Sequence, residues 1–249
     1  MRAQKFELVD EQGRVRASLA CDDGLTELNM LGDDEKTTAT LRIRKDGSTA
    51  LTFADAKRNA RMLLGSTGKG FSGLGFSDGA GNSRVALGTG ATGAPALSLH
   101  YASGKLAGLL TVQNERDAAL ILNGPKGDTN LALGNSDGRP NILMLDDKGV
   151  ERMKLVLKED NSPALMLRDS KGNPRLLAGV TADTWAGLGL MDAKGVVRTL
   201  MFSESRGDSG ISVSDSAGKS RGALAINADN KARVEILDDA GKVLFGQPK

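Results

Sequence analysis

The chain repeats one pattern about every 23 residues, and this period constrains its fold more than any other feature. In the clearest copy two apolar residues alternate with small ones from Leu188, Asp192 ends the run, Gly195 follows three positions later, and Arg198 follows three after that. With that Asp as position 0, eight of the ten steps between copies are 23 residues long and two are 22. The eleven copies are centred on Asp10, Gly32, Asp55, Asp78, Tyr101, Gly124, Asp146, Asp169, Asp192, Asp215 and Asp238. We expect one repeat array over residues 1–249, without a domain boundary.

Each copy contains two stretches in which apolar residues alternate with other residue types. Positions −4 and −2 are apolar in all eleven copies, as Leu188 and Leu190 illustrate. Position +9 is mostly Leu, and position +7 holds smaller or mixed residues. A spacing of two indicates a β-strand with one buried face, so each copy predicts two strands that contribute to one core. No helical period survives the frequent Gly, and the chain is predicted to be all-β.

The connection between the two strands has a regular turn chemistry. Asp at position 0 with Gly at +3 is typical of a type I turn, in which the Asp side chain accepts backbone N–H groups and Gly takes a positive φ. An Arg column at +6 is the expected counter-charge of the Asp residues. Its members are Arg16, Arg61, Arg84, Arg152, Arg175, Arg198 and Arg221.

Two arrangements of eleven two-stranded repeats agree with this pattern. The favoured one is an elongated β-solenoid that stacks one repeat per layer with Leu and Ile columns inside. The alternative is a long antiparallel β-meander whose apolar face is buried by folding over or by oligomerisation, because the Asp-x-x-Gly turns fit hairpins. The layered arrangement is similar to that of bacterial β-solenoid scaffold proteins and phage fibre shafts. The similarity is architectural and implies no site residues.

Composition narrows the classes of partner. The chain has 33 basic and 31 acidic residues in an even spread, so no basic stripe predicts nucleic-acid binding. No apolar run reaches the ~18 residues of a membrane helix, so membrane insertion is not expected. Cys21 is the single cysteine, which excludes an intramolecular disulfide. The first residues contain no apolar core of a signal peptide, so a cytoplasmic location is expected, with an extracellular fibre as the alternative.

Several motifs suggest chemistry but have simpler explanations. The Gly-rich stretches 68–73 and 88–93 lack the strand–helix setting of a phosphate loop, and His100 is expected to be a solvated residue without a catalytic or metal-binding partner. Adjacent carboxylates, such as Asp146 and Asp147, lie in expected turns. The position 0 Asp residues form a row, but each repeat supplies only one reliable carboxylate for calcium. We therefore assign no catalytic, cofactor-binding or metal-binding residue and expect no cofactor.

Arg206, Gly207 and Asp208 form the one stretch with an interaction motif. Together with Ser209 they resemble the integrin-binding tetrapeptide of adhesion proteins, and they lie at an expected loop. In a chain this rich in Arg, Gly and Asp, a chance match competes with that interpretation. The three residues are a candidate interaction loop.

The combined pattern predicts a protein without enzymatic activity. We expect a structural or scaffold protein, a repetitive β-rod that self-associates into an oligomer or filament or presents its turns to a protein partner. The competing hypotheses are a carbohydrate-active β-helix hydrolase that uses two carboxylates and an adhesion or binding module that uses the Arg206 loop.

Overall fold

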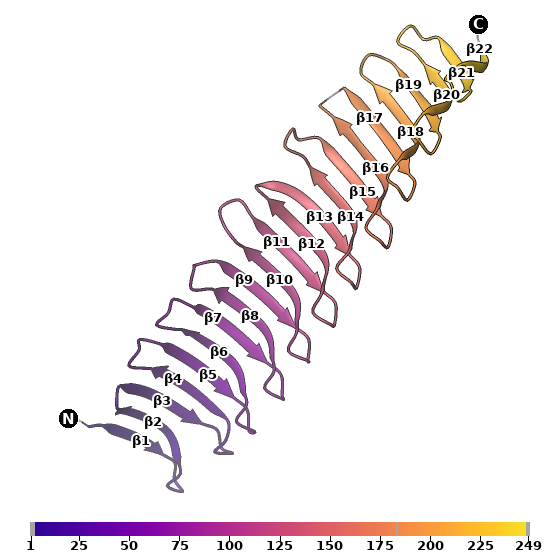
Figure 1. Ribbon diagram of the computed structural model, residues 1–249. Helices are drawn as coiled ribbons and strands as arrows, with labels where there is room; N and C mark the ends of the chain where they lie inside the picture. Colours follow the sequence, from indigo (N-terminus) through magenta and orange to yellow (C-terminus); the bar gives the residue numbers. More distant parts are fainter. Residues whose placement is uncertain (1–2, 183, 248–249) are drawn as a thin grey trace. The chain divides into compact units, whose positions relative to one another are not determined.

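The computed structural model describes residues 3–182 and 184–247, and all regular secondary structure in these ranges is β-strand. The all-β class and the two strands per repeat are thereby confirmed. The chain divides into two compact units, Met1–Gly127 and Asp128–Lys249. Figure 1 labels the strands of both units along the chain.

The strands of the first unit, hereafter unit 1, have the following bounds: β1 Lys5–Val9, β2 Val15–Asp22, β3 Leu25–Leu31, β4 Thr38–Ile43, β5 Thr49–Ala54, β6 Ala60–Ser66, β7 Ser72–Ser77, β8 Ser83–Thr89, β9 Pro95–His100, β10 Leu106–Val112 and β11 Ala118–Asn123. The strands of the second, unit 2, are β12 Thr129–Ser136, β13 Arg139–Leu145, β14 Glu151–Leu157, β15 Pro163–Arg168, β16 Pro174–Thr181, β17 Trp185–Met191, β18 Val197–Glu204, β19 Ser209–Ser214, β20 Ser220–Ile226, β21 Ala232–Leu237 and β22 Val243–Gln247.

Within each unit, every strand pairs antiparallel with the next strand along the chain. The pairing runs from β1 to β11 in unit 1 and from β12 to β22 in unit 2. Each unit is therefore the meander, and the favoured stacking of repeats in layers is not the arrangement found. The physical reason is the turn length, since a turn of a few residues can only return the chain antiparallel to the strand it leaves.

The hairpin turns explain why two of the repeat steps are shorter. Most of the turns at the strand ends opposite the position 0 turns are closed by two backbone hydrogen bonds. Between β4 and β5, for example, Arg44 N–H donates to Ser48 O and Gly47 N–H donates to Arg44 O. The two 22-residue steps instead contain two-residue turns, Asp23-Gly24 and Asp137-Gly138. All four of these residues have positive φ, the requirement of a type I′ turn. Each of these steps is therefore one residue shorter because its turn is shorter. The flanking strands keep their register.

One face of each unit carries two rows of mostly apolar side chains. The register places positions −4 and +9 opposite each other and −2 opposite +7 on successive strands, so that Leu51 lies between Leu41 and Leu64. We call the row of positions −4 and +9 the outer row and the row of positions −2 and +7 the inner row. The face that carries both rows is the apolar face. The outer row of unit 1 is Phe6, Leu19, Leu28, Leu41, Leu51, Leu64, Leu74, Leu87, Leu97, Leu110 and Leu120. The outer row of unit 2 is Leu133, Ile142, Leu155, Leu165, Ala178, Leu188, Met201, Ile211, Leu224, Val234 and Gln247.

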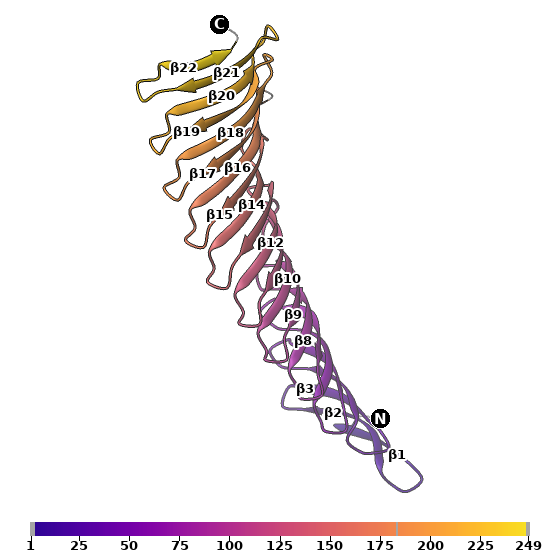
Figure 2. The same cartoon turned by 90° about the vertical axis from the view of Figure 1, so that its right-hand side faces the viewer.

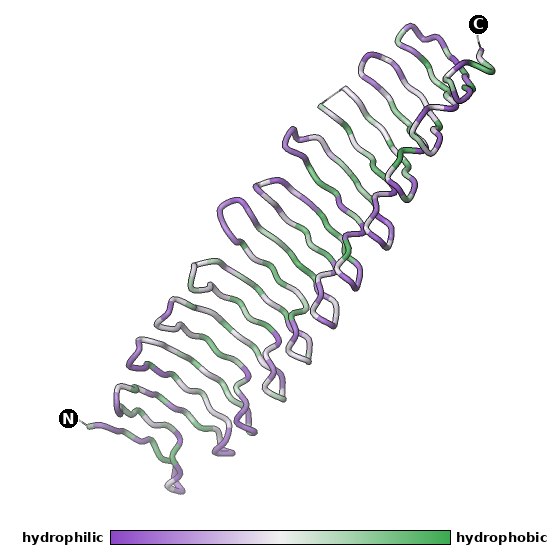
Figure 3. Tube along the Cα trace, viewed as in Figure 1, coloured by the Kyte–Doolittle hydropathy of each residue, from purple (hydrophilic) through white to green (hydrophobic). Residues whose placement is uncertain are grey.

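These rows were expected to form a buried core, and this expectation is wrong for the single chain. Leu190 is 43% exposed and Leu64 is 47% exposed. Among the described residues, the only buried apolar ones are Ala50 and Ala164. Figure 3 shows apolar segments along the strands and hydrophilic residues in many of the turns. The reason is that an antiparallel sheet buries a face only when a second layer covers it.

The reverse face carries a row in which many residues are small, at points where neighbouring backbones come close. A Cβ on Gly73 would lie 2.7 Å from Leu87 O, and one on Gly179 would lie 2.7 Å from Pro163 O. Ala50, Gly88 and Gly210 belong to the same row in the register. At Gly73 and Gly179 a larger residue is therefore excluded by space. Figure 2 shows in addition that the successive strands of β14–β22 rotate relative to one another, as twisted antiparallel sheets do.

Candidate interaction surface

The position 0 Asp residues cap their own turns. In the turn after β17, Asp192 Oδ1 accepts the backbone N–H of Lys194 at 2.9 Å and of Val196 at 3.2 Å. Gly195 N–H donates to Asp192 O, and Gly195 has a φ of 81°. The same pair of side-chain bonds occurs at Asp10, Asp55, Asp78, Asp146, Asp169, Asp215 and Asp238. The predicted capping role is confirmed.

The Arg at +6 is the extra residue of a β-bulge. Leu190 pairs with Thr199 and Met191 with Val197, so Arg198 has no partner in the register. The register skips the Arg in the same way at Arg16, Arg61, Arg84, Arg152, Arg175 and Arg221. A bulge redirects the side chain of its extra residue, and this one turns the Arg toward the edge of the sheet that carries the capped turns.

From the bulge, the Arg joins two repeats. Arg198 Nη1 lies 3.5 Å from Asp192 Oδ2, and its Nε donates to Ser214 O at 2.9 Å, one position before the next Asp. Arg61, Arg84, Arg152 and Arg175 donate from Nε to the equivalent carbonyl of the following repeat. The predicted Asp–Arg pairing is confirmed, and the carbonyl bond makes it a link between neighbouring hairpins. Because these groups are partly exposed, each ion pair contributes little energy.

Hydrogen bonds within the turns also lower the pKa of carboxyls such as those of Asp192 and Asp34. The backbone N–H of Lys194 and then that of Val196 lower the pKa of Asp192, against a desolvation effect that raises it. Hydrogen bonds from the backbone of Lys36 and Thr37 lower the pKa of Asp34 to about 2. These shifts follow from turn geometry, since hydrogen bonds to a carboxylate favour its ionised form.

In repeats that lack the position 0 Asp, other side chains make hydrogen bonds at the turn. After β3, where Gly32 stands at position 0, Asp34 Oδ1 accepts the N–H of Lys36 and Thr37. In the next irregular repeat, the Tyr101 hydroxyl donates to Asn123 O at 2.8 Å and so reaches the following hairpin. The turns at these positions are thus irregular in sequence and still hydrogen-bonded.

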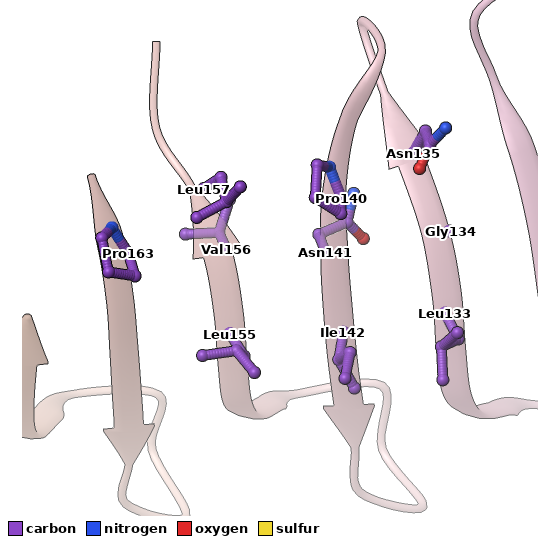
Figure 4. Close-up of a pocket in the computed structure, with 10 residues that line it drawn as sticks. All are labelled: Leu133, Gly134, Asn135, Pro140, Asn141, Ile142, Leu155, Val156, Leu157 and Pro163. Atoms are coloured by element: carbon purple, nitrogen blue, oxygen red, sulfur yellow. The ribbon is translucent and has the colours of Figure 1, made fainter. Parts of the chain in front are cut away.

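A hollow of about 410 Å³ opens over β12–β15 in unit 2. Leu133, Ile142 and Leu155 of the outer row line it, together with Leu157 and Pro163. Figure 4 shows these side chains coming from four neighbouring strands. The hollow interrupts the apolar face and has the chemistry to receive an apolar side chain.

A second hollow, of about 390 Å³, lies on the reverse face of β3–β6 in unit 1. It is polar, and its lining groups bond to one another: Thr40 Oγ1 donates to Asn29 Oδ1 at 2.8 Å. Arg42, which also lines the hollow, pairs with Glu27. These polar groups stabilise neighbouring strands of the sheet.

The candidate loop Arg206–Asp208 forms the turn between β18 and β19. Arg206 and Gly207 are exposed, and Gly207 has a φ of 101°. Asp208 is half-buried, and its Oδ1 accepts the N–H of Ala228 in the next turn on that edge at 3.2 Å. The carboxylate therefore links two turns, and a role of the three residues in recognition stays a prediction.

The other sequence candidates also lie in turns or strand ends. The Gly-rich stretches form hairpin turns in which Gly70 donates to Thr67 O and Gly93 to Gly90 O. The expectation of a solvated His100 is wrong, because the residue is half-buried and its shielded Nδ1 has no hydrogen-bond partner among the described residues. In the described ranges no three His, Cys, Asp or Glu side chains are grouped so as to hold a metal ion.

Two features of the surface were missed from the sequence. The bulge at +6 was visible only as an Arg column, although an odd spacing between apolar positions −2 and +7 across a tight turn could have indicated an extra residue. The exposure of the apolar rows had no signal in the sequence, because alternation reports which residues share a face and not whether that face is covered.

Comparisons with known proteins leave the family open. No protein-family model and no curated protein matches the chain. Among solved structures, the chain is similar to a Bacteroides uniformis protein provisionally described as a 6-phosphogluconolactonase, at 13% identity and a TM-score of 0.21, over 97% of this chain and 83% of that one.

Two further structures show the same level of similarity. A porin-like protein from Bacteroides uniformis has 10% identity and a TM-score of 0.17, over 90% of this chain and 94% of that one. The periplasmic gluconolactonase of Pseudomonas aeruginosa has 13% identity and a TM-score of 0.18, over 92% and 83%. At these scores no argument about function rests on the similarity. Separately, the described residues include no helix of the length and hydropathy needed to cross a membrane.

Proposed function

We propose that the protein is a structural or scaffold protein without enzymatic activity, which self-associates and displays its regularly spaced turns. The observation that carries the proposal is the apolar face, whose large side chains stay exposed in the single chain. Covering apolar surface is the main favourable contribution to folding and association. A sheet with this face needs a second layer for stability.

The repeat geometry supports the same proposal. Each position 0 turn is completed by its own Asp and linked to the next repeat by Arg, so the turn edge is a regular series of similar polar loops. The Asp and Arg side chains of these loops make the hydrogen bonds that hold the turns. A regular edge beside a continuous apolar face suits assembly and display.

The proposal is tested by light scattering over a concentration series, with electron microscopy of the same samples and an assay on glycoside and lactone substrates. The expected result is a concentration-dependent mass above that of the 26.0 kDa chain, particles of uniform width, and no turnover. A strict monomer at every concentration would contradict self-association. Turnover that disappears in a turn variant such as Asp146→Asn would establish the hydrolase alternative instead.

A further inference from the structure

The exposed surface of the chain is too large for a protein that works alone. Its accessible area is 16171 Å², whereas a compact monomer of 26.0 kDa exposes about 10,500 Å². The excess, about 5,700 Å² on one chain by subtraction, is more than one partner contributes to an obligate interface, roughly 1,000–2,500 Å². Most of the exposed large apolar side chains belong to the outer and inner rows. The apolar face is therefore the surface that needs a partner.

We propose that this partner is a second copy of the chain, packed sheet against sheet through the apolar face. The inference rests on the proposed function and specifies the surface through which self-association occurs. Two sheets pack about 10 Å apart with interdigitated side chains. The large residues of the outer row then lie against the mixed large and small residues of the inner row of the facing copy.

The available area is sufficient for a stable pair. Neighbouring strands lie about 4.8 Å apart, so the eleven strands of one unit span roughly 50 Å, and strand lengths of five to eight residues give a width of roughly 18 Å. One unit thus offers about 900 Å² per copy, or about 1,800 Å² in total, which matches a standard specific interface.

The chemistry of the face favours a copy of itself over other partners. The outer row of unit 1 contains only Leu and Phe, and no charged side chain interrupts it. A lipid surface is instead met with an aromatic belt, and the chain has one Trp and one Tyr. Because the rows repeat with the period of the hairpins, the spacing of one copy matches the spacing of another. A two-fold interface requires such self-complementarity.

The hollow over β12–β15 adds shape to this surface. It lies on the apolar face, and Leu133, Ile142 and Leu155 line it. In a face-to-face pair it receives an apolar side chain from the facing sheet. Apolar side chains that fill pockets contribute much of the binding energy of an interface, so the hollow gives unit 2 a defined point of contact.

Two adjacent residues of β6 provide a matched test. Leu64 belongs to the outer row, pairs with Leu51 and Leu74, and is 47% exposed. Leu63 points to the reverse face, pairs with Thr52 and Gly75, and is 43% exposed. The two share residue type, strand and exposure, and differ in the face on which they lie.

The experiment compares Leu64→Glu and Leu63→Glu in the full chain by sedimentation or light scattering over a concentration series. The wild-type chain is expected to reach twice 26.0 kDa. We expect Leu64→Glu to raise the dissociation constant at least about a hundredfold, because a buried unpaired charge is strongly unfavourable, and Leu63→Glu to change it by less than about threefold. Equal effects of the two variants would overturn the pairing through this face.

Two single-cysteine variants test the same inference if Leu64→Glu fails to fold. Cys21 is free and exposed, so Leu64→Cys and Leu63→Cys are each made with Cys21→Ser. At concentrations where the chain is associated, a maleimide is expected to modify Cys at position 64 at least about tenfold more slowly than Cys at position 63. Equal rates would contradict a covered apolar face.

The outcomes separate this inference from the proposed function. Association that survives in Leu64→Glu, for example through edge strands, would overturn face pairing and leave the proposed self-association standing. A wild-type chain that stays monomeric would overturn both. Loss of association in Leu64→Glu alone supports both.

Discussion

The position 0 turn and the apolar face of the same repeat differ in whether a single chain completes their interactions. At Asp192, the carboxylate is bonded by Lys194 and Val196, and Arg198 links the turn to the next hairpin. Two residues earlier, Leu190 stands 43% exposed with no layer above it. Local hydrogen bonds are completed within the repeat, whereas burial requires a second surface. The comparison teaches that this chain specifies its hairpins by itself and leaves the apolar face of those hairpins uncovered.

The largest expected effect comes from a charge on the apolar face. Leu190→Asp should lower the stability of the associated protein by roughly 3–5 kcal/mol, because the carboxylate becomes buried without a partner. In a dissociated chain the same carboxylate would remain in water and the loss should be far smaller. Denaturant unfolding at several protein concentrations checks this difference. A loss that is the same at every concentration would show that the face is not covered on association.

Glycine substitutions compare the two faces directly. Gly88→Ala should cost roughly 1–3 kcal/mol through overpacking, because a Cβ there would overlap Ser72 O and lie 2.8 Å from Gly73 Cα. Gly108 belongs to the inner row, and its Cβ would meet Leu122 Cδ2 at an ordinary 3.5 Å. Gly108→Ala should be neutral or slightly stabilising, since it also restricts the unfolded chain. Thermal unfolding of the two variants tests the assignment, and a tolerated Gly88→Ala would refute the close backbone approach.

A turn variant should have a smaller effect than either. Asp192→Ala removes the acceptor of two backbone N–H groups, and we expect less than half the destabilisation of Gly88→Ala, because these groups lie near water. Asp192→Asn keeps a capping oxygen and should recover most of the loss. Thermal unfolding measures both. If Asp192→Ala also lowered association by tenfold or more, the separation between turn edge and apolar face would be wrong.

Acid should weaken the turns gradually and through the carboxyls alone. Several capped Asp residues have pKa values that are lowered in the folded chain, as at Asp78 by the backbone N–H of Asn82 and at Asp34 to about 2. The others at position 0 are Asp10, Asp55, Asp146, Asp169, Asp192 and Asp215. Their stabilisation is therefore present above the unfolded value of 3.8 and is lost as pH falls toward about 2. Denaturant midpoints between pH 7 and pH 2 should show this decline. The apolar rows of unit 1 carry no titratable group, so a comparable decline above pH 5 would point to a different cause.

Much of the fold could be predicted from the sequence because its determinants are local. The alternation around Leu188 and Leu190 predicted the strands, and Asp192 with Gly195 predicted the turn. The pairing of strands was predicted less well, since a stack of repeats and a meander share the same alternation. Turn length decides between them, and the Asp23-Gly24 and Asp137-Gly138 turns show the hairpin character most directly.

The sequence by itself determined the eleven repeats, their two strands, and the Asp and Arg positions that hold each turn, because these depend on residues close together in the chain. Only the tertiary structure decided that strands pair with their neighbours, that each Arg at +6 is the extra residue of a bulge, and that the apolar rows remain exposed. The physical reason is that burial depends on what lies opposite a face. A periodic sequence defines the face, and the three-dimensional arrangement determines what covers it.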